Sequence, residues 1–151
     1  VLFAGDTVEF GATPYCGDAH FKDWSATLAV IRALKPEKLV PGRGRCLVGE
    51  KEVEEAIAGT ASFTSDLYAI AQKAVADGKD LNATYKLAMS EMKPKYGHWV
   101  IFEHCMPFNV SRAYDEAGGL DHPKIWTAER DLEMWRALEG AQPIKSAEVN
   151  A

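Results

Sequence analysis

Two short motifs place residues capable of chemistry directly after apolar segments. Asp6 follows the apolar residues 1–4 and Gly5, and the glycine turn Pro41-Gly42-Arg43-Gly44 follows an apolar pair. A carboxylate is ionised at neutral pH and can bind a cation through either oxygen. A guanidinium also stays charged, but it only donates hydrogen bonds and therefore suits anionic groups. The two motifs predict a charged site for binding or catalysis.

β-Strands are expected to position both motifs. Residues 1–4 and 39–40 are short apolar runs typical of buried strands. Between them we expect a helix with Asp23 as its N-cap, which ends before Pro36. The ends of such strands lie at one rim of a sheet, where α/β proteins bind ligands. Asp6 and Arg43 are therefore expected near each other.

The rest of the sequence has the periodicity of helices. We expect helices from residue 50 to a C-cap at Gly59, from 64 or 65 to Gly78, from 82 to just before Pro94, from 107 to Gly118, and from 127 to Gly140. Residues 99–102 fit either a strand or a helix. Because strands are few and the first residues already read as a buried strand, we expect the chain to be part of a larger fold.

Composition limits the classes of function. The chain has 151 residues, of which 47% are hydrophobic and 26% charged, which is typical of a globular protein. A net charge of −5 gives no basic field for nucleic acid or an anionic membrane. No apolar run is long enough for a transmembrane helix. The three cysteines predict reduced thiols and a cytoplasmic location.

In their order and spacing, the Gly5-Asp6 strand end, the Asp23-Trp24 helix start and the Pro-Gly-x-Gly turn resemble the C-terminal half of the metallo-β-lactamase fold. The resemblance covers residues 1–60 in detail. It implies an α/β fold, the C-terminal part of an αββα sandwich with two mixed sheets, followed by a mainly helical extension. The implied domains are residues 1–60, a helical C-terminal extension at 61–140, and a loose tail at 141–151.

The resemblance also implies a metal site. The family's Asp at this position bridges two metal ions, so Asp6 is the expected metal ligand for one or two zinc ions; its alternative role is to cap a turn after the strand. The third residue of the family's Pro-Gly-x-Gly is normally a metal-binding His, but here it is Arg43. Arg43 has no lone pair for a metal. It either contacts an anionic group of the substrate or forms a salt bridge that closes the loop.

Further ligands of this implied site are absent from the sequence. The family's His-x-His-x-Asp-His cluster does not occur, and one carboxylate alone does not hold zinc against water. An N-terminal part of the same protein is therefore the expected partner. His20 is a second candidate for substrate binding, or else an exposed loop residue. Cys46 is expected to be buried, and His104-Cys105 does not suit a nucleophile and its base.

The implied function is that of a fragment of a metal-dependent hydrolase of the metallo-β-lactamase superfamily. Its zinc-bound hydroxide would attack a small-molecule ester, thioester, lactone or lactam, and the fragment alone is expected to be inactive. We assign no catalytic residue. The alternative is a non-catalytic helical interaction or oligomerisation module in which both turns are structural. An exposed sheet edge would then be covered by another segment or by a second copy in a homo-oligomer.

Overall fold

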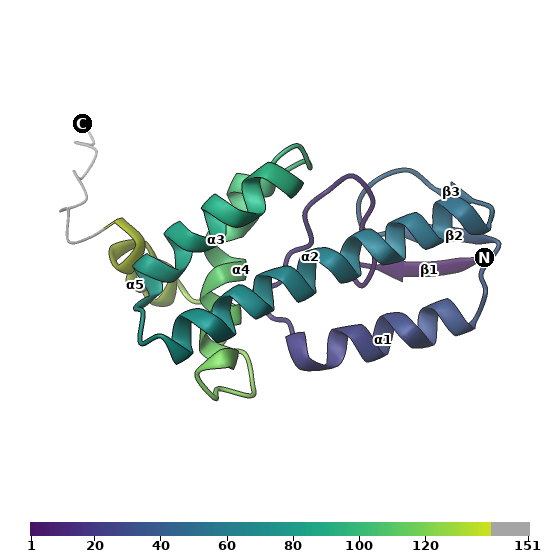
Figure 1. Cartoon of the computed structure of the whole chain (residues 1–151). Helices are drawn as coiled ribbons and strands as arrows, with labels where there is room; N and C mark the ends of the chain where they lie inside the picture. The colour runs from purple at the N-terminus through teal and green to yellow at the C-terminus, as the bar shows by residue number, and fades with distance from the viewer. Residues whose placement is uncertain (140–151) are drawn as a thin grey trace.

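The computed structural model describes residues 1–139, most of which lie in five helices. The elements in chain order are β1 (Leu2–Gly5), α1 (Phe21–Ala33), β2 (Lys38–Pro41), β3 (Leu47–Val48), α2 (Glu50–Ala76), α3 (Leu81–Tyr96), α4 (Phe102–Ala117) and α5 (Ala128–Glu139). In Figure 1, α2 runs along the molecule, with the sheet and α1 beside its first part and α3, α4 and α5 near its last part. We call residues 1–59 the sheet half and residues 60–139 the helical half.

The sheet half contains one three-stranded sheet in the order β1-β2-β3. β1 and β2 are parallel, with Phe3 opposite Val40, whereas β3 is antiparallel to β2. One face of the sheet packs through Leu39 and Leu47 against Leu28 of α1 and the first turns of α2. Because β1 and β2 run in the same direction, their carboxyl ends lie at one rim, as the sequence predicted.

The expected fold class is wrong. Among residues 1–139 the three strands form one small sheet, and helices make up most of the structure, so these residues do not form an αββα sandwich with an extension. The strands cover few residues because the apolar runs at their positions are only two to four residues long. The chain is a mainly helical protein with a small sheet, and α2 runs without a break through the predicted boundary at residues 60 and 61.

The predicted helix boundaries need three corrections in which packing outweighs local signals. Gly59 lies inside α2 and not at its end, because the turns on both sides of it are buried; this burial exceeds the cost of about 1 kcal/mol for a helical glycine. Pro94 lies inside α3, which continues to Tyr96, whose hydroxyl donates to Asp66 at 2.8 Å. Pro107 is the sixth residue of α4 and not part of its first turn.

Two further segments differ from the sequence prediction. α1 begins at Phe21 with His20 as its N-cap, so Asp23 lies within the first turn and does not cap the helix. Residues 99–101 form a turn that leads into α4, and Val100 makes an isolated parallel bridge with Ala12. The N-cap expected at Thr127 is present, since its hydroxyl accepts from the backbone N–H of Arg130 at 3.3 Å. The predicted tail at residues 141–151 lies outside the described residues.

Each half has its own cluster of buried side chains. In the helical half, Phe63 and Met106 are fully buried in a cluster that also receives Phe21 from α1. In the sheet half, Leu39 and Ile57 belong to a smaller cluster. None of the helices within residues 1–139 combines the length and the apolar character needed to cross a membrane.

Candidate functional site

Asp6 lies at the carboxyl end of β1, where its side chain is 67% exposed. The backbone turns at Gly5, whose φ is +53°, a conformation that glycine adopts readily. The turn after β2 approaches so closely that a Cβ atom on Gly42 would lie 2.4 Å from Oδ1 of Asp6. The glycine at position 42 is therefore what allows the two strand ends, and the two motifs found in the sequence, to meet.

Arg43 lies beside Asp6, but its principal partner is Glu9. Its guanidinium Nη1 donates to Oε1 of Glu9 at 2.7 Å and lies 3.7 Å from Oδ1 of Asp6. The backbone N–H of Arg43 donates to the other Glu9 oxygen. Of the two roles predicted for Arg43, the geometry contains the salt bridge that closes the loop. The side chain is still 38% exposed, so the guanidinium also has free surface next to Asp6.

Glu9 is the residue of this site that sequence reasoning missed. Its side chain is fully buried, and burial raises its pKa above 4.5 while Arg43 opposes that rise. The backbone of Glu9 is held as well, because its N–H donates to the hydroxyl of Thr60 at 3.0 Å. The only local signal is an acidic residue between two apolar residues, Val8 and Phe10. A charge there needs a cation, and Arg43 supplies it from 34 residues away.

A groove of about 560 Å³ opens beside Asp6. It is lined by side chains from the end of β1, the following loop and the first turns of α1, which include Asp6, Tyr15, Asp18, His20, Asp23 and Trp24. The structure therefore brings Asp6 and His20 to one groove. Arg43 is not among its lining residues and contacts Asp6 from the side. Carboxylates, an imidazole and aromatic rings give the groove hydrogen-bonding groups and apolar surface together.

The cysteines contribute no metal ligand to this groove. Cys16 and Cys105 are buried, and burial raises the pKa of both thiols, so both remain protonated at neutral pH. Cys46 is exposed, so its predicted burial is wrong: Leu47 and not Cys46 points into the core. His104 is exposed although Cys105 beside it is buried, so these two side chains face different surroundings.

Asp6 has no set of further metal ligands around it. Among residues 1–139, no three His, Cys, Asp or Glu side chains lie close enough together to hold a metal ion. The nearest charged neighbour of Asp6 is the Arg43 guanidinium, which repels a cation. The residues described here therefore do not form a metal centre by themselves.

The chain was also compared with known proteins. No family model and no curated protein matched it.

Proposed function

We propose that this chain supplies one metal-binding carboxylate, Asp6, and one wall of the substrate groove to a metal-dependent hydrolase of the metallo-β-lactamase superfamily. The substrate class is an ester, thioester, lactone or lactam. The observation that carries the proposal is the position of Asp6, which is exposed at the carboxyl end of a parallel strand and borders a groove shared with His20. A carboxylate in that position can reach a cation and a ligand at the same time.

In this proposal Arg43 binds an anionic group of the substrate. Glu9 holds the guanidinium at 2.7 Å and leaves part of the side chain exposed, so the group is oriented before a ligand arrives. Its charge cannot be lost near neutral pH. His20, the N-cap residue of α1, lines the groove and contacts the substrate as a hydrogen-bonding group.

The other ligands of the one or two zinc ions must come from residues other than those described here, because Asp6 stands without a ligand set. The proposal assigns them to another segment of the same protein that contains a His-x-His-x-Asp-His stretch. It places the protein in the cytoplasm, where a reducing environment keeps the three unpaired cysteines as thiols.

Metal analysis of the protein that contains this stretch tests the proposal. After dialysis against buffer without metal, Asp6→Ala should lose most of the zinc that the unchanged protein retains, because a ligand is gone. Asp18→Ala removes another carboxylate of the same groove and should leave the zinc content unchanged. Equal zinc in the Asp6→Ala variant would sink the proposal. So would zinc-dependent ester or lactam hydrolysis by the 151-residue chain alone.

One observation favours a second candidate, a non-catalytic interaction or oligomerisation module. On the sheet face away from the helices, Phe3 is 78% and Val48 is 58% exposed, and Val40 lies between their strands. Exposed apolar side chains on a sheet are typical of a surface that binds another chain. Light scattering after size exclusion tests this candidate: a dimer that dissociates in a Phe3→Ser variant, together with no zinc in any form of the protein, would favour it over the hydrolase.

A further inference from the structure

Helix α4 carries a buried polar stripe that consists of Asn109, Arg112 and Glu116. These residues are separated by three and four positions, so they lie on one side of the helix. Their exposed fractions are only 0 to 2%. Most helix faces that are buried to this extent are apolar. This stripe instead hydrogen-bonds to the backbone of residues 14–22, the segment that forms one wall of the groove.

Asn109 holds the beginning of that segment. Its side-chain carbonyl accepts from the backbone N–H of Cys16 at 2.6 Å, and its amide donates to the carbonyl of Pro14 at 2.8 Å. One side chain therefore satisfies one donor and one acceptor of a buried loop, as a neighbouring strand would.

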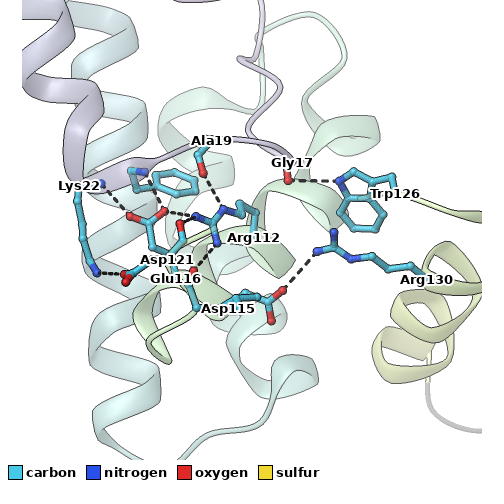
Figure 2. Close-up of polar contacts among 11 residues, drawn as sticks. Gly17, Ala19, Lys22, Arg112, Asp115, Glu116, Asp121, Trp126 and Arg130 are labelled. Carbon is cyan, nitrogen blue, oxygen red and sulfur yellow. Dashed lines mark hydrogen bonds and ion pairs between the residues drawn. The ribbon is translucent and has the colours of Figure 1, made fainter. Parts of the chain in front are cut away.

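Arg112 holds the middle of the segment and joins it to the chain after α4. Its guanidinium donates to the backbone carbonyls of Ala19 at 2.6 Å, Leu120 at 2.8 Å and Asp121 at 2.9 Å. It also donates to Oε2 of Glu116 at 2.9 Å. Figure 2 shows this guanidinium at the centre of the network. The side chain of Arg112 is fully buried, and its bond to Glu116 forms away from water, whereas its bonds to the three backbone carbonyls are partly buried.

Glu116 holds the start of α1. Its two carboxylate oxygens accept from the backbone N–H groups of Phe21 at 2.9 Å and Lys22 at 3.0 Å, 94 to 95 residues away in sequence. These are the first two residues of α1, and the N-cap residue His20 makes no side-chain bond to them. The Glu116 carboxylate therefore caps the N-terminus of α1 in place of His20, and its negative charge suits the positive end of the helix dipole.

His20 lies between these two anchors. The carbonyl of Ala19 before it is fixed by Arg112, and the N–H of Phe21 after it is fixed by Glu116. Within the described residues, the other backbone hydrogen bonds at His20 are those that its own carbonyl accepts from Asp23 and Trp24 in the first turn of α1. The imidazole faces the groove from a backbone that the helical half sets in place.

We propose that Arg112 and Glu116 are positioning residues of the groove, which act through the backbone of Ala19–Lys22 to set the place of His20. This inference rests on the proposed function in taking the groove as the substrate site. A buried ion pair by itself is weak evidence for stability, because apolar residues of similar volume often replace it without loss. Such residues would leave Ala19, Phe21 and Lys22 without their partners, so the pair fixes a geometry that an apolar pair cannot.

Amide hydrogen exchange and the NMR signals of the His20 ring in the full 151-residue chain test the inference. Glu116→Gln keeps the size of the side chain but removes its charge and one acceptor oxygen. Exchange at Phe21 and Lys22 should become about five- to tenfold faster, the amount expected from a lost helix cap, and the His20 ring signals should move. The control Val110→Ala lies on the same helix and only shortens a buried apolar side chain.

A merely structural role predicts a different result. If Glu116→Gln and Val110→Ala, compared at equal loss of global stability, change residues 19–22 equally, the inference is overturned. Arg112→Lys offers a second variant that keeps the charge opposite Glu116 but lacks the planar fork. Because Arg112 donates to the carbonyls of Leu120 and Asp121, the variant should move the carbonyl NMR signals of these two residues and the His20 ring signals, while the Phe21 and Lys22 amides stay protected. Unchanged His20 signals in both variants would also overturn it.

These measurements need neither metal nor substrate, so they are independent of the zinc test. In the zinc-containing protein, Glu116→Gln should leave the metal content unchanged, whereas Asp6→Ala should lower it. Loss of zinc in neither variant, together with a loosened residue 19–22 segment in Glu116→Gln, would reject the hydrolase and retain the positioning role. Loss of zinc in Asp6→Ala, together with an unchanged residue 19–22 segment in Glu116→Gln, would reject the positioning role and retain the hydrolase.

Discussion

The helical half and the sheet half bury their side chains to different extents. The cluster centred on the helical half contains thirteen buried residues, among them Phe63 and Tyr96, and the partly buried ring of Trp99 packs against it. The cluster in the sheet half contains seven, and large apolar side chains such as Phe3 and Val48 remain exposed there. Stability is therefore concentrated in the half opposite to the one that presents Asp6, Arg43 and the rim of the sheet.

This difference indicates that the helical half holds part of the sheet half in place. Polar groups that a helix would ordinarily keep at its surface are buried on α4, and their partners are backbone atoms of the groove wall. A well-packed helix is a rigid support, so the groove takes its shape from the half with the larger core. The predictions below test whether the two halves differ in this way, beginning with the largest expected effect.

Replacing phenylalanine by alanine should lower stability far more in the helical half than in the sheet half. Phe63 is completely buried, so Phe63→Ala should lower the free energy of unfolding by about 3–5 kcal/mol, through lost burial and the cavity left behind. Phe3 is 78% exposed, so Phe3→Ala should change it by only about 0.5 kcal/mol. Urea unfolding followed by circular dichroism measures both. Equal losses would show that the exposed sheet face is covered in solution, and the contrast between the halves would be broken.

Within the sheet half, the Glu9–Arg43 pair should carry the next largest effect. Arg43→Ala leaves the buried Glu9 carboxylate without its cation. Breaking a buried pair costs about 3–5 kcal/mol; because Arg43 is partly exposed, we expect about 2–3 kcal/mol at neutral pH in urea unfolding. Arg45→Ala is a control, since Arg45 belongs to an exposed pair with Glu52 and should matter little. A loss no larger than that of the control would contradict the pairing.

The effect of Arg43→Ala should depend on pH. Burial raises the pKa of Glu9 in the folded protein above its ordinary value of 4.5. The folded state therefore binds this proton more tightly than the unfolded state, and stability falls as pH rises from 4.5 through the folded pKa. Arg43 opposes the rise, so its removal raises the pKa further and widens the window. The variant should lose most stability at about pH 7 and least near pH 4. An equal loss at both pH values would contradict this.

The turn after β2 should tolerate a substitution at Gly44 less well than the turn before α2 tolerates one at Gly49. Gly44 has a φ of +105°, and a Cβ atom there would lie 2.3 Å from the carbonyl oxygen of Phe10. Gly44→Ala should cost about 2 kcal/mol in thermal unfolding, from strain and a backbone clash. Gly49 has a similar φ of +93° but open space around it, so Gly49→Ala carries the strain alone, about 1 kcal/mol. Equal costs would mean that the rim is not closely packed.

Local signals in the sequence were sufficient for the parts of this molecule whose partners are near in the chain. The short strands, the end of α1 before Pro36 and the cap at Thr127 are each signalled by residues within a few positions. The meeting of Asp6 with Arg43, which are far apart in the sequence, follows from the rim that the ends of parallel strands share. The αββα fold class was inferred from two short motifs, and the helical remainder does not follow it.

Other features depend on distant partners and left little trace in the sequence. Glu9 looks like a loop acid until Arg43 folds against it. Arg112 and Glu116 interrupt the apolar face of α4 at a spacing of four, which resembles an ordinary surface pair. Their backbone partners lie up to 95 residues away, so only the folded chain shows that the pair is buried and what it holds.

The smallest expected effect concerns a third connection between the helical half and the groove wall. The indole N–H of Trp126 donates to the carbonyl of Gly17 at 3.2 Å, and Arg130 stacks on the ring while it pairs with Asp115 (Figure 2). Trp126→Phe keeps an aromatic ring under Arg130 but removes that donor. The loss should be about 1 kcal/mol or less by calorimetry, because this hydrogen bond is only partly buried.

The control for this variant is Trp135→Phe on α5, a partly exposed tryptophan for which no hydrogen bond to the groove wall is present within residues 1–139. It should leave both stability and the exchange at residues 17–22 unchanged. If Trp126→Phe moves the carbonyl NMR signal of Gly17 but leaves amide exchange at Phe21 unchanged, the wall is held at two separate points, with Arg112 and Glu116 responsible for His20. If exchange rises along the whole segment, the Trp126–Arg130 pair and the Arg112–Glu116 pair support the groove wall together. The positioning role proposed for Glu116 would then belong to Trp126 as well.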